Sequence, residues 1–261
     1  MANSQTIRET YAVASNVPNV PQKFIAGVEL EIEDIKTLNV NMELLGWSIT
    51  EDGSLRNNGK ELISGPFEFD KLVNDFKVIH SSIKHSAKPA PFTERTSIHV
   101  HVNCLDLNQD QVKSMVLWYA LFEPVFFAMV EPHRANNIHC VPLDQTVLCE
   151  NYRRNIPIMV QKWSKYTALN LLPLGKYGTI EFRHMEGHSD SAKFTWWLKT
   201  LQNLWAYGKD NILTRELLKQ DKVVLNAFDA IFKDAPIKSI RGSVEELVSD
   251  TLIDIKLSLF S

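Results

Sequence analysis

The sequence predicts an α+β fold in which an antiparallel or mixed sheet has one polar face and one face covered by helices. Two segments, 27–33 and 96–103, alternate apolar and polar residues with the period of a half-buried strand. Two others, 71–85 and 190–207, repeat apolar residues at helical spacing. Because the predicted strands are short and joined by turns or long excursions, a buried parallel sheet is less consistent with the pattern.

The composition is that of a protein with a substantial core and no electrostatic signature of a polyanionic partner. The chain has 261 residues, of which 44% are hydrophobic, and a formal net charge of −3. We therefore expect neither stable nucleic-acid binding nor attachment to a membrane, and no stretch reaches the ~18 consecutive apolar residues of a membrane span. Three cysteines without zinc-type spacing favour a reducing, cytoplasmic location.

The first strand carries the most distinctive pattern. Residues 1–22 are expected to form a flexible tail, and 27–33 then alternate aliphatic side chains with Glu29, Glu31 and Glu33. Three carboxylates on one strand face repel one another, so they need a counter-charge or raised pKa values. A hard divalent cation such as Mg²⁺ meets this need through oxygen ligands. The alternative is a solvated edge strand whose charges discourage aggregation.

The following elements are shorter until a long helix begins. A turn signal at 51–54 and the Gly-Pro pair after residue 64 separate the predicted strands. Asp70 is expected to cap the helix over 71–85. In order, the sequence predicts a short helix over 39–46, a strand from 47, a turn at 51–54, a strand over 60–64 and the helix over 71–85.

The second half of the chain contains the clearest strand and the longest helices. In the strand over 96–103 the side chains of His99, His101 and Asn103 share one face, and in a later strand Glu181 and Arg183 do the same. Between these strands the sequence predicts a helix capped by Asp106 or Asn108 and kinked at Pro124, followed by an irregular segment over 131–160. Strands are expected over 165–171 and 179–183, and a helix from Ser189 or Asp190 that Gly208 stops. The region over 209–261 is expected to be helical, and its last helix opens with a capping box at 243–246.

Together the polar strand faces are typical of a site for a metal ion and a nucleotide. Divalent ions would neutralise the glutamates and bridge phosphate oxygens, and arginine would bind phosphate bidentately. Each residue alone also fits a solvent-facing or hydrogen-bonded role, so the prediction depends on several strands coinciding. The set comprises Glu29, Glu31, Glu33, Glu61, His99, His101, Asn103, Glu181 and Arg183.

These motifs, in this order, resemble the amidoligase family of phages, bacteria and fungi, which is related to glutamate–cysteine ligase and glutamine synthetase. The resemblance covers roughly residues 24–207. It departs from the family pattern at Gly65, where a proline is usual, and at Thr96-Ser97, where a glycine is common; both changes affect turn geometry. The motifs are Gly27-Val28-Glu29-Leu30-Glu31, Asp52-Gly53-Ser54, Glu61-Leu62-Ile63-Ser64-Gly65-Pro66, Ser97-Ile98-His99-Val100-His101-Val102, Lys165-Tyr166 with Ala168-Leu169-Asn170, and Thr179-Ile180-Glu181-Phe182-Arg183.

The resemblance implies a curved, funnel-like antiparallel sheet and an ATP-dependent reaction that joins a carboxylate to an amine through an acyl phosphate. It implies a catalytic domain over 23–208 and a helical C-terminal extension over 209–261. It assigns Mg²⁺, or Mn²⁺ in its place, to one cluster of ligands, and gives catalytic roles to Glu181, Arg183 and Arg134. Arg183, Ser54 and Lys165 would contact the nucleotide, and Glu29, Glu31, Glu61, His101 and Glu181 would bind the metal.

The same residues also allow other functions. The same face would suit a metal-dependent hydrolase, although no His-Glu-x-x-His motif is present, or a guanidino phosphotransferase, or an inactive scaffold that binds nucleotide or a partner. The substrates would be small-molecule or peptide carboxylates and amines, with residues 131–160 as a lid. If a phage encodes the chain, we expect it in the host cytoplasm. The sequence does not assign the substrates, the oligomeric state, or roles for His99 and Glu33.

Overall fold

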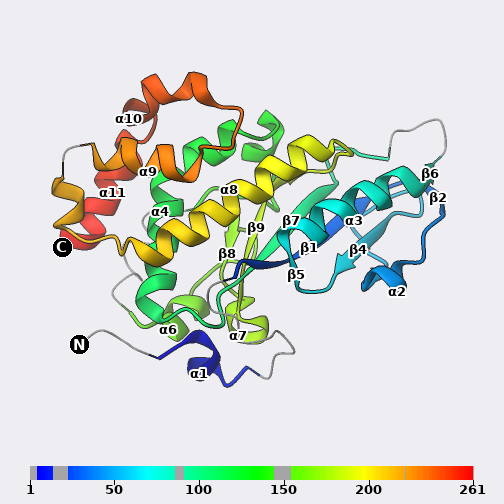
Figure 1. Ribbon diagram of the computed structural model, residues 1–261, viewed down its shortest axis with the longest axis horizontal. Coiled ribbons are helices and arrows are strands. Elements are labelled where there is room, and N and C mark those ends of the chain that lie inside the picture. The colour runs from blue at the N-terminus through cyan, green and yellow to red at the C-terminus, as the bar shows by residue number, and fades with distance from the viewer. Residues whose placement is uncertain (1–4, 14–22, 86–90, 144–153, 221, 261) are drawn as a thin grey trace.

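The computed structural model describes residues 5–13, 23–85, 91–143, 154–220 and 222–260. It confirms the α+β class with a mainly antiparallel sheet (Figure 1). Seven strands form this open sheet in the order β3-β4-β1-β7-β9-β8, with β5 paired to β1. The strands are β1 Ile25–Ile32, β3 Trp47–Thr50, β4 Lys60–Ser64, β5 Phe67–Glu68, β7 Ser97–Asn103, β8 Leu169–Asn170 and β9 Thr179–Glu186; β2 Ile35–Leu38 and β6 Ile83–His85 form a separate pair.

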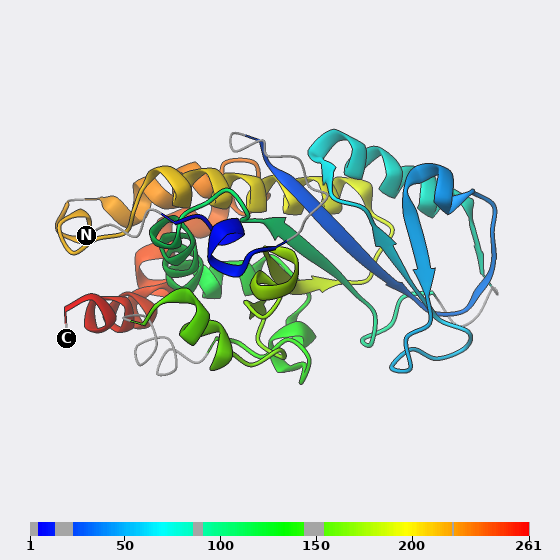
Figure 2. The ribbon, with the colours of Figure 1, turned by 90° about the horizontal axis from the view of Figure 1, so that it is seen from below.

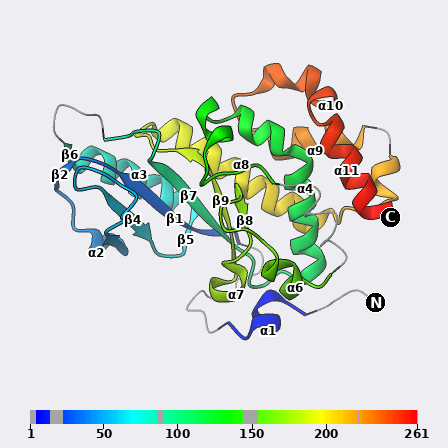
Figure 3. The same cartoon turned by 180° about the vertical axis from the view of Figure 1, so that it is seen from behind.

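Two helices lie along one face of the sheet. α3 (Phe69–Ser82) and α8 (Ser191–Asp210) run beside each other there, as the perpendicular view shows (Figures 1 and 2). From behind, β1 and β7 lie in front of both helices (Figure 3). The alternation in the strands accounts for this layering, because the apolar side chains of β1 and β7 are buried in the core with those of α3 and α8, and the polar ones point the other way.

The long helix α4 (Gln109–Ala128) forms the centre of the helical part. The Asn108 side chain accepts a hydrogen bond from the backbone N–H of Gln111, and the Gln111 side chain accepts one from Asn108 in return, which starts the helix. Pro124 lies inside α4, and the kink expected there stays a prediction. Gly208 does not stop α8, which continues to Asp210. A Cβ added at Gly208 would lie 2.9 Å from the Cα of Met115, so the glycine allows α8 to approach α4 closely.

The C-terminal helices pack on this helical part. α9 contacts α8, and α10 and α11 contact α4. Their buried side chains, among them Val244 and Ile255, belong to the same core as α4. The remaining elements are α1 Ile7–Tyr11, α2 Met42–Leu45, η1 Pro132–Asn136, α6 Ile156–Gln161, α7 Leu174–Tyr177, η2 Leu217–Lys219, α9 Val223–Ile231, η3 Lys238–Ser243, α10 Val244–Leu247 and α11 Ser249–Phe260.

Several predicted elements differ from those observed. Part of the expected flexible tail is the helix α1, whose Ile7 is fully buried and donates its N–H to the carbonyl of Leu107. The helix predicted over 71–85 follows Glu68 rather than Asp70 and ends at Ser82, because 83–85 pair with β2 as β6. The strand predicted over 165–171 shortens to β8, and the backbone of 166–168 instead bonds to Val141.

The predicted capping box at 243–246 does not form, since Ser243 makes no side-chain cap and already belongs to a 3₁₀ turn. Within the irregular segment expected over 131–160, the structure contains η1 and the start of α6. Residues 144–153 lie outside the described residues, so the predicted lid stays a prediction. Among the described helices none is long and apolar enough to cross a membrane.

Candidate active site

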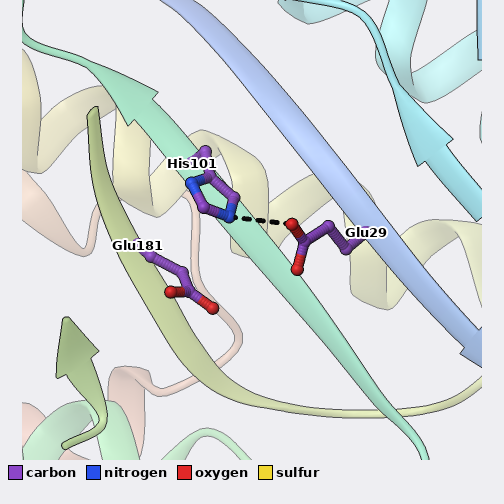
Figure 4. Close-up of side chains that lie close together, drawn as sticks. All are labelled: Glu29, His101 and Glu181. Carbon is purple, nitrogen blue, oxygen red and sulfur yellow. Dashed lines mark ion pairs between the residues drawn. The ribbon is translucent and has the colours of Figure 1, made fainter. Parts of the chain in front are cut away.

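Three adjacent strands bring a first cluster of ligand atoms together on the polar sheet face. In the antiparallel register Glu29 of β1 lies opposite His99 of β7, and His101 of β7 lies opposite Glu181 of β9. Glu29, His101 and Glu181 each offer one ligand atom, and these three atoms lie within 4.8 Å of one another. Figure 4 shows the three side chains extending from neighbouring strands into one space. We call them the first cluster.

Glu29 and the two histidines of β7 form a partly buried charged group. Glu29 Oε1 lies 3.2 Å from His101 Nε2, and Glu29 Oε2 lies 3.2 Å from His99 Nδ1. Burial raises the pKa of Glu29, but the neighbouring His101 and His99 outweigh it and hold that pKa well below its usual range. Burial alone would lower the pKa of His101, but Glu29 beside it raises that pKa. The pair therefore favours its charged form.

One nitrogen of this group is not hydrogen-bonded. His101 Nε2 is buried and close to Glu29, but it has no hydrogen-bond partner in the part of the chain that the structure describes. The carboxylate of Glu29, 3.2 Å away, compensates the charge of the ring but does not complete a hydrogen bond to this nitrogen. Imidazole nitrogen is a common metal ligand. His101 therefore fits a role as a ligand of a cation held between Glu29 and Glu181.

Glu181 is held by hydrogen bonds on both carboxylate oxygens. Arg183 Nη1 donates to its Oε1 at 2.5 Å, and Asn170 Nδ2 donates to its Oε2 at 2.6 Å. Asn170 faces Glu181 across the β8–β9 pair. Asn170 belongs to one of the sequence motifs, but its role could not be predicted, because only the pairing of β8 with β9 brings it to the site.

A bulge in β9 orients Arg183. Ile98 pairs with Met185, whereas Val100 pairs with Phe182, so β9 has an extra residue opposite His99. Arg134 is buried and donates from Nε to the carbonyl of His184 at 2.8 Å and from Nη2 to that of Arg183 at 2.6 Å. Its guanidinium thus holds the backbone of the bulge. Arg183 in turn donates from Nε to the carbonyl of His139 at 3.0 Å.

A second cluster lies on the other side of β1. Glu31 of β1 pairs with Glu61 of β4, and the turn after β3 adds Asp52; one ligand atom from each lies within 4.8 Å of the others. Burial, followed by the charge of Glu29, raises the pKa of Glu61. Within the described residues none of these three carboxylates forms an ion pair.

The five predicted metal ligands thus divide between the two clusters. Glu29, His101 and Glu181 belong to the first, and Glu31 and Glu61 to the second. The resemblance implies one set of ligands, with Glu29, Glu31 and Glu61 on one side of the phosphates, and does not include Asp52. Turn residues give little indication of where a side chain points, and the Asp52-Gly53-Ser54 motif was the only signal available.

Two residues of the predicted polar face have other roles. Glu33 accepts hydrogen bonds from the Arg56 N–H at 2.8 Å and the Thr93 hydroxyl at 3.1 Å, so its carboxylate ties two loops together. The side-chain oxygen of Asn103, at the end of β7, accepts a hydrogen bond from the Leu105 N–H at 3.1 Å and stabilises the turn there. Both are buried.

The second cluster opens into a cleft of about 600 Å³. Ser54 and Lys165 line it, as does Arg134. The carbonyl of Ser54 accepts two hydrogen bonds from Arg95, and Lys165 Nζ lies 4.8 Å from the centre of the Tyr166 ring. The lining consists of Glu31, Asp52, Ser54, Glu94, Arg95, Ser97, His133, Arg134, Asn136, Asn137, Ile138, His139, Lys165, Tyr166 and Arg183.

Comparison with known proteins identifies one family that the chain matches. Residues 28–205 match the model of the family described as "putative amidoligase enzyme". The matched range begins in β1 and ends in α8, so it contains both clusters and the cleft. No curated protein matches the chain.

Proposed function

We propose that this chain, which belongs to the amidoligase family, is an ATP-dependent ligase that joins a carboxylate to an amine. The observation that carries the proposal is the pair of carboxylate clusters on one sheet face beside a cleft lined with arginines. Family membership indicates a ligase-type enzyme. The use of ATP, the divalent ions and the acyl phosphate are what the resemblance to this family implies, and the two clusters of ligand atoms support the divalent ions.

The donor atoms of both clusters fit hard divalent cations. The first cluster offers two carboxylates and His101 Nε2, which makes no hydrogen bond within the described residues, and the second offers three carboxylates. Carboxylate oxygens suit Mg²⁺ and Mn²⁺, and a single imidazole is compatible with Mn²⁺ in particular. We propose one ion at each cluster. Bound ions would neutralise phosphate oxygens and so lower the barrier to phosphoryl transfer.

The fixed arginine of β9 would complete the charge neutralisation. Arg183 lines the cleft, and its guanidinium is held by Glu181 and by the carbonyl of His139. Arg134 holds the bulge from which Arg183 extends. A cation fixed in place before the reaction stabilises the charge that develops during phosphoryl transfer, because little reorganisation is needed. Lys165 and Ser54, which also line the cleft, are proposed to contact the nucleotide.

In the proposed reaction a substrate carboxylate oxygen bonds to the γ-phosphorus of ATP as the bond to ADP breaks. The amine nitrogen then attacks the carbonyl carbon, phosphate leaves, and the nitrogen loses a proton to give the amide. We propose small-molecule or peptide carboxylates and amines as substrates. The mixed charge of the cleft, with Asp52 and Glu94 as well as Lys165 and Arg183 in its lining, supports binding of both groups.

The test is thermal unfolding with and without Mg-ATP. Ligand at about 100 times its dissociation constant should add about 2.7 kcal/mol to the stability of the wild type. Glu29→Ala and Glu181→Ala should lose this stabilisation. Glu246→Ala, an exposed glutamate of α10, is the matched control and should keep it. No Mg-dependent shift in the wild type would contradict the proposal and favour the scaffold alternative.

A positive shift is followed by a screen for ADP release. Pairs of carboxylates and amines are incubated with the wild type, Arg183→Ala and Glu246→Ala. The proposal predicts ADP release that requires both substrates in the wild type and in Glu246→Ala, and loss of that release in Arg183→Ala. Release of ADP that requires only water would instead indicate hydrolysis.

A further inference from the structure

We infer that Ser97 and His99 are positioning residues that form a hydrogen-bonded bridge between the first and second clusters. Through this bridge the geometry of one ion site depends on the other. The inference rests on the proposed function, because it presumes that each cluster binds a divalent ion. Neither Ser97 nor His99 belongs to a cluster.

Ser97 holds Glu31 of the second cluster with two donors. Its hydroxyl donates to Glu31 Oε2 at 2.5 Å, and its backbone N–H donates to the same oxygen at 2.8 Å. Both residues are more than nine-tenths buried. Hydrogen bonds to a carboxylate in such surroundings are strong and restrict its position. The other oxygen, Oε1, makes no hydrogen bond within the described residues, so it can face Asp52 and Glu61.

His99 continues the bridge to the first cluster. Its Nε2 lies 2.8 Å from Ser97 Oγ. The Ser97 hydroxyl group thus contacts both the Glu31 carboxylate and the His99 ring. On the opposite side of the ring, Nδ1 lies 3.2 Å from Glu29 Oε2 and 3.4 Å from Glu181 Oε1. The imidazole therefore contacts two members of the first cluster and spaces them apart.

The strand geometry makes this bridge rigid. Ser97 and His99 are two residues apart on β7, so both point to the polar face. Each is only 4% exposed. The extra residue of the β9 bulge lies opposite His99. A change at Ser97 can reach Glu29 and Glu181 through the His99 ring, although Ser97 has no hydrogen bond to either of them.

The test isolates the first cluster and perturbs it from the far end of the bridge. In the Asp52→Asn/Glu61→Gln background only the first cluster retains its full set of ligands. Mn²⁺ binding is measured by calorimetry and by electron paramagnetic resonance. Adding Ser97→Ala should lower the Mn²⁺ affinity of the first cluster about tenfold. This is the lower end of the effect that loss of a contact positioning a metal ligand usually has.

Thr50→Val in the same background is the matched control. In the wild type the Thr50 hydroxyl donates to Glu61 Oε2 at 3.1 Å, and with glutamine at position 61 it can still donate to the side-chain amide oxygen, so this change perturbs the second cluster and not the bridge. This change should leave the Mn²⁺ affinity of the first cluster unaltered. A merely structural role for Ser97 would lower the melting temperature without changing the affinity, and equal affinities for Ser97→Ala and its parent would overturn the inference.

The reverse experiment covers the case in which Ser97→Ala does not fold. In the Glu181→Gln background, His99→Gln should weaken the Mn²⁺ site of the second cluster, and an unchanged affinity would overturn the inference. The two hypotheses fail differently. If the wild type binds no Mn²⁺, the proposed ion sites are wrong and the bridge with them. If both sites bind Mn²⁺ but respond to neither bridge variant, only the bridge is wrong.

Discussion

A buried carboxyl behind the active face gives a quantitative prediction about pH. Glu123 of α4 accepts hydrogen bonds from the Tyr119 hydroxyl at 2.5 Å and from the Leu143 N–H at 2.7 and 2.9 Å. These contacts tie the segment that forms one wall of the cleft to the core. Burial raises the pKa of Glu123 to about 7, against the opposite effect of Tyr119 and Leu143.

The raised pKa makes ionisation of Glu123 unfavourable in the folded state. Below pH 4.5, the usual value, the group is protonated in both states and contributes no pH dependence. As the pH rises from 4.5 to about 7, the unfolded chain loses this proton first and stability falls. Above pH 7 the folded state bears the full free-energy cost of ionising Glu123. Each unit of pKa difference corresponds to about 1.36 kcal/mol, so this cost is on the order of 3 kcal/mol.

The assay compares wild type and Glu123→Gln by urea unfolding at several pH values between 4 and 8.5. Glutamine can accept a hydrogen bond from the Leu143 N–H, and it cannot ionise. We expect the stability of the variant relative to wild type to increase by about 3 kcal/mol between pH 4.5 and 7.5, and then to level off. Contributions of other titrating groups cancel in this difference. A difference that is independent of pH would refute the reasoning, as would the same dependence in Glu246→Gln, an exposed control.

Three further changes follow from single contacts. Gly208→Ala should lower the free energy of unfolding by about 1–3 kcal/mol in urea titrations, because the added methyl group meets the backbone of α4. An unchanged free energy of unfolding would contradict the close contact between α8 and α4. Asn170→Leu should weaken Mn²⁺ binding at the first cluster about tenfold in calorimetry, since Glu181 loses one of its donors; unchanged binding would show that Asn170 is dispensable. Arg134→Lys should lower the rate of ADP formation more than the nucleotide affinity, because lysine cannot hold both carbonyls of the bulge; an equal effect on both would argue for direct contact with the nucleotide.

The period of side-chain alternation was sufficient to predict which residues share a face. Glu29 and Glu31 of β1, and His99 and His101 of β7, point to the polar side as expected, because their aliphatic neighbours are driven into the core. The same reasoning predicts Glu181 and Arg183 together on β9.

Strand order and loops could not be predicted in this way. Alternation does not say that β4, β1, β7 and β9 are neighbours, and this order separates Glu31 from Glu29 into two clusters. Asp52 and Arg134 enter the site from a turn and a 3₁₀ helix, where side-chain direction has no period. The polar composition of residues 1–22 predicts a flexible tail, yet Ile7 fixes part of this segment as a helix. One buried side chain and backbone hydrogen bonds to residues 105–107 are enough to hold it.

The central claim is that the polar sheet face binds two divalent ions. The most direct measurement is the number of Mn²⁺ ions bound per chain, determined by calorimetry and electron paramagnetic resonance. We predict two ions for the wild type, one for Glu181→Gln and one for Asp52→Asn/Glu61→Gln. Binding of a single ion that both variants abolish would indicate one shared site, and no binding at all would contradict the account.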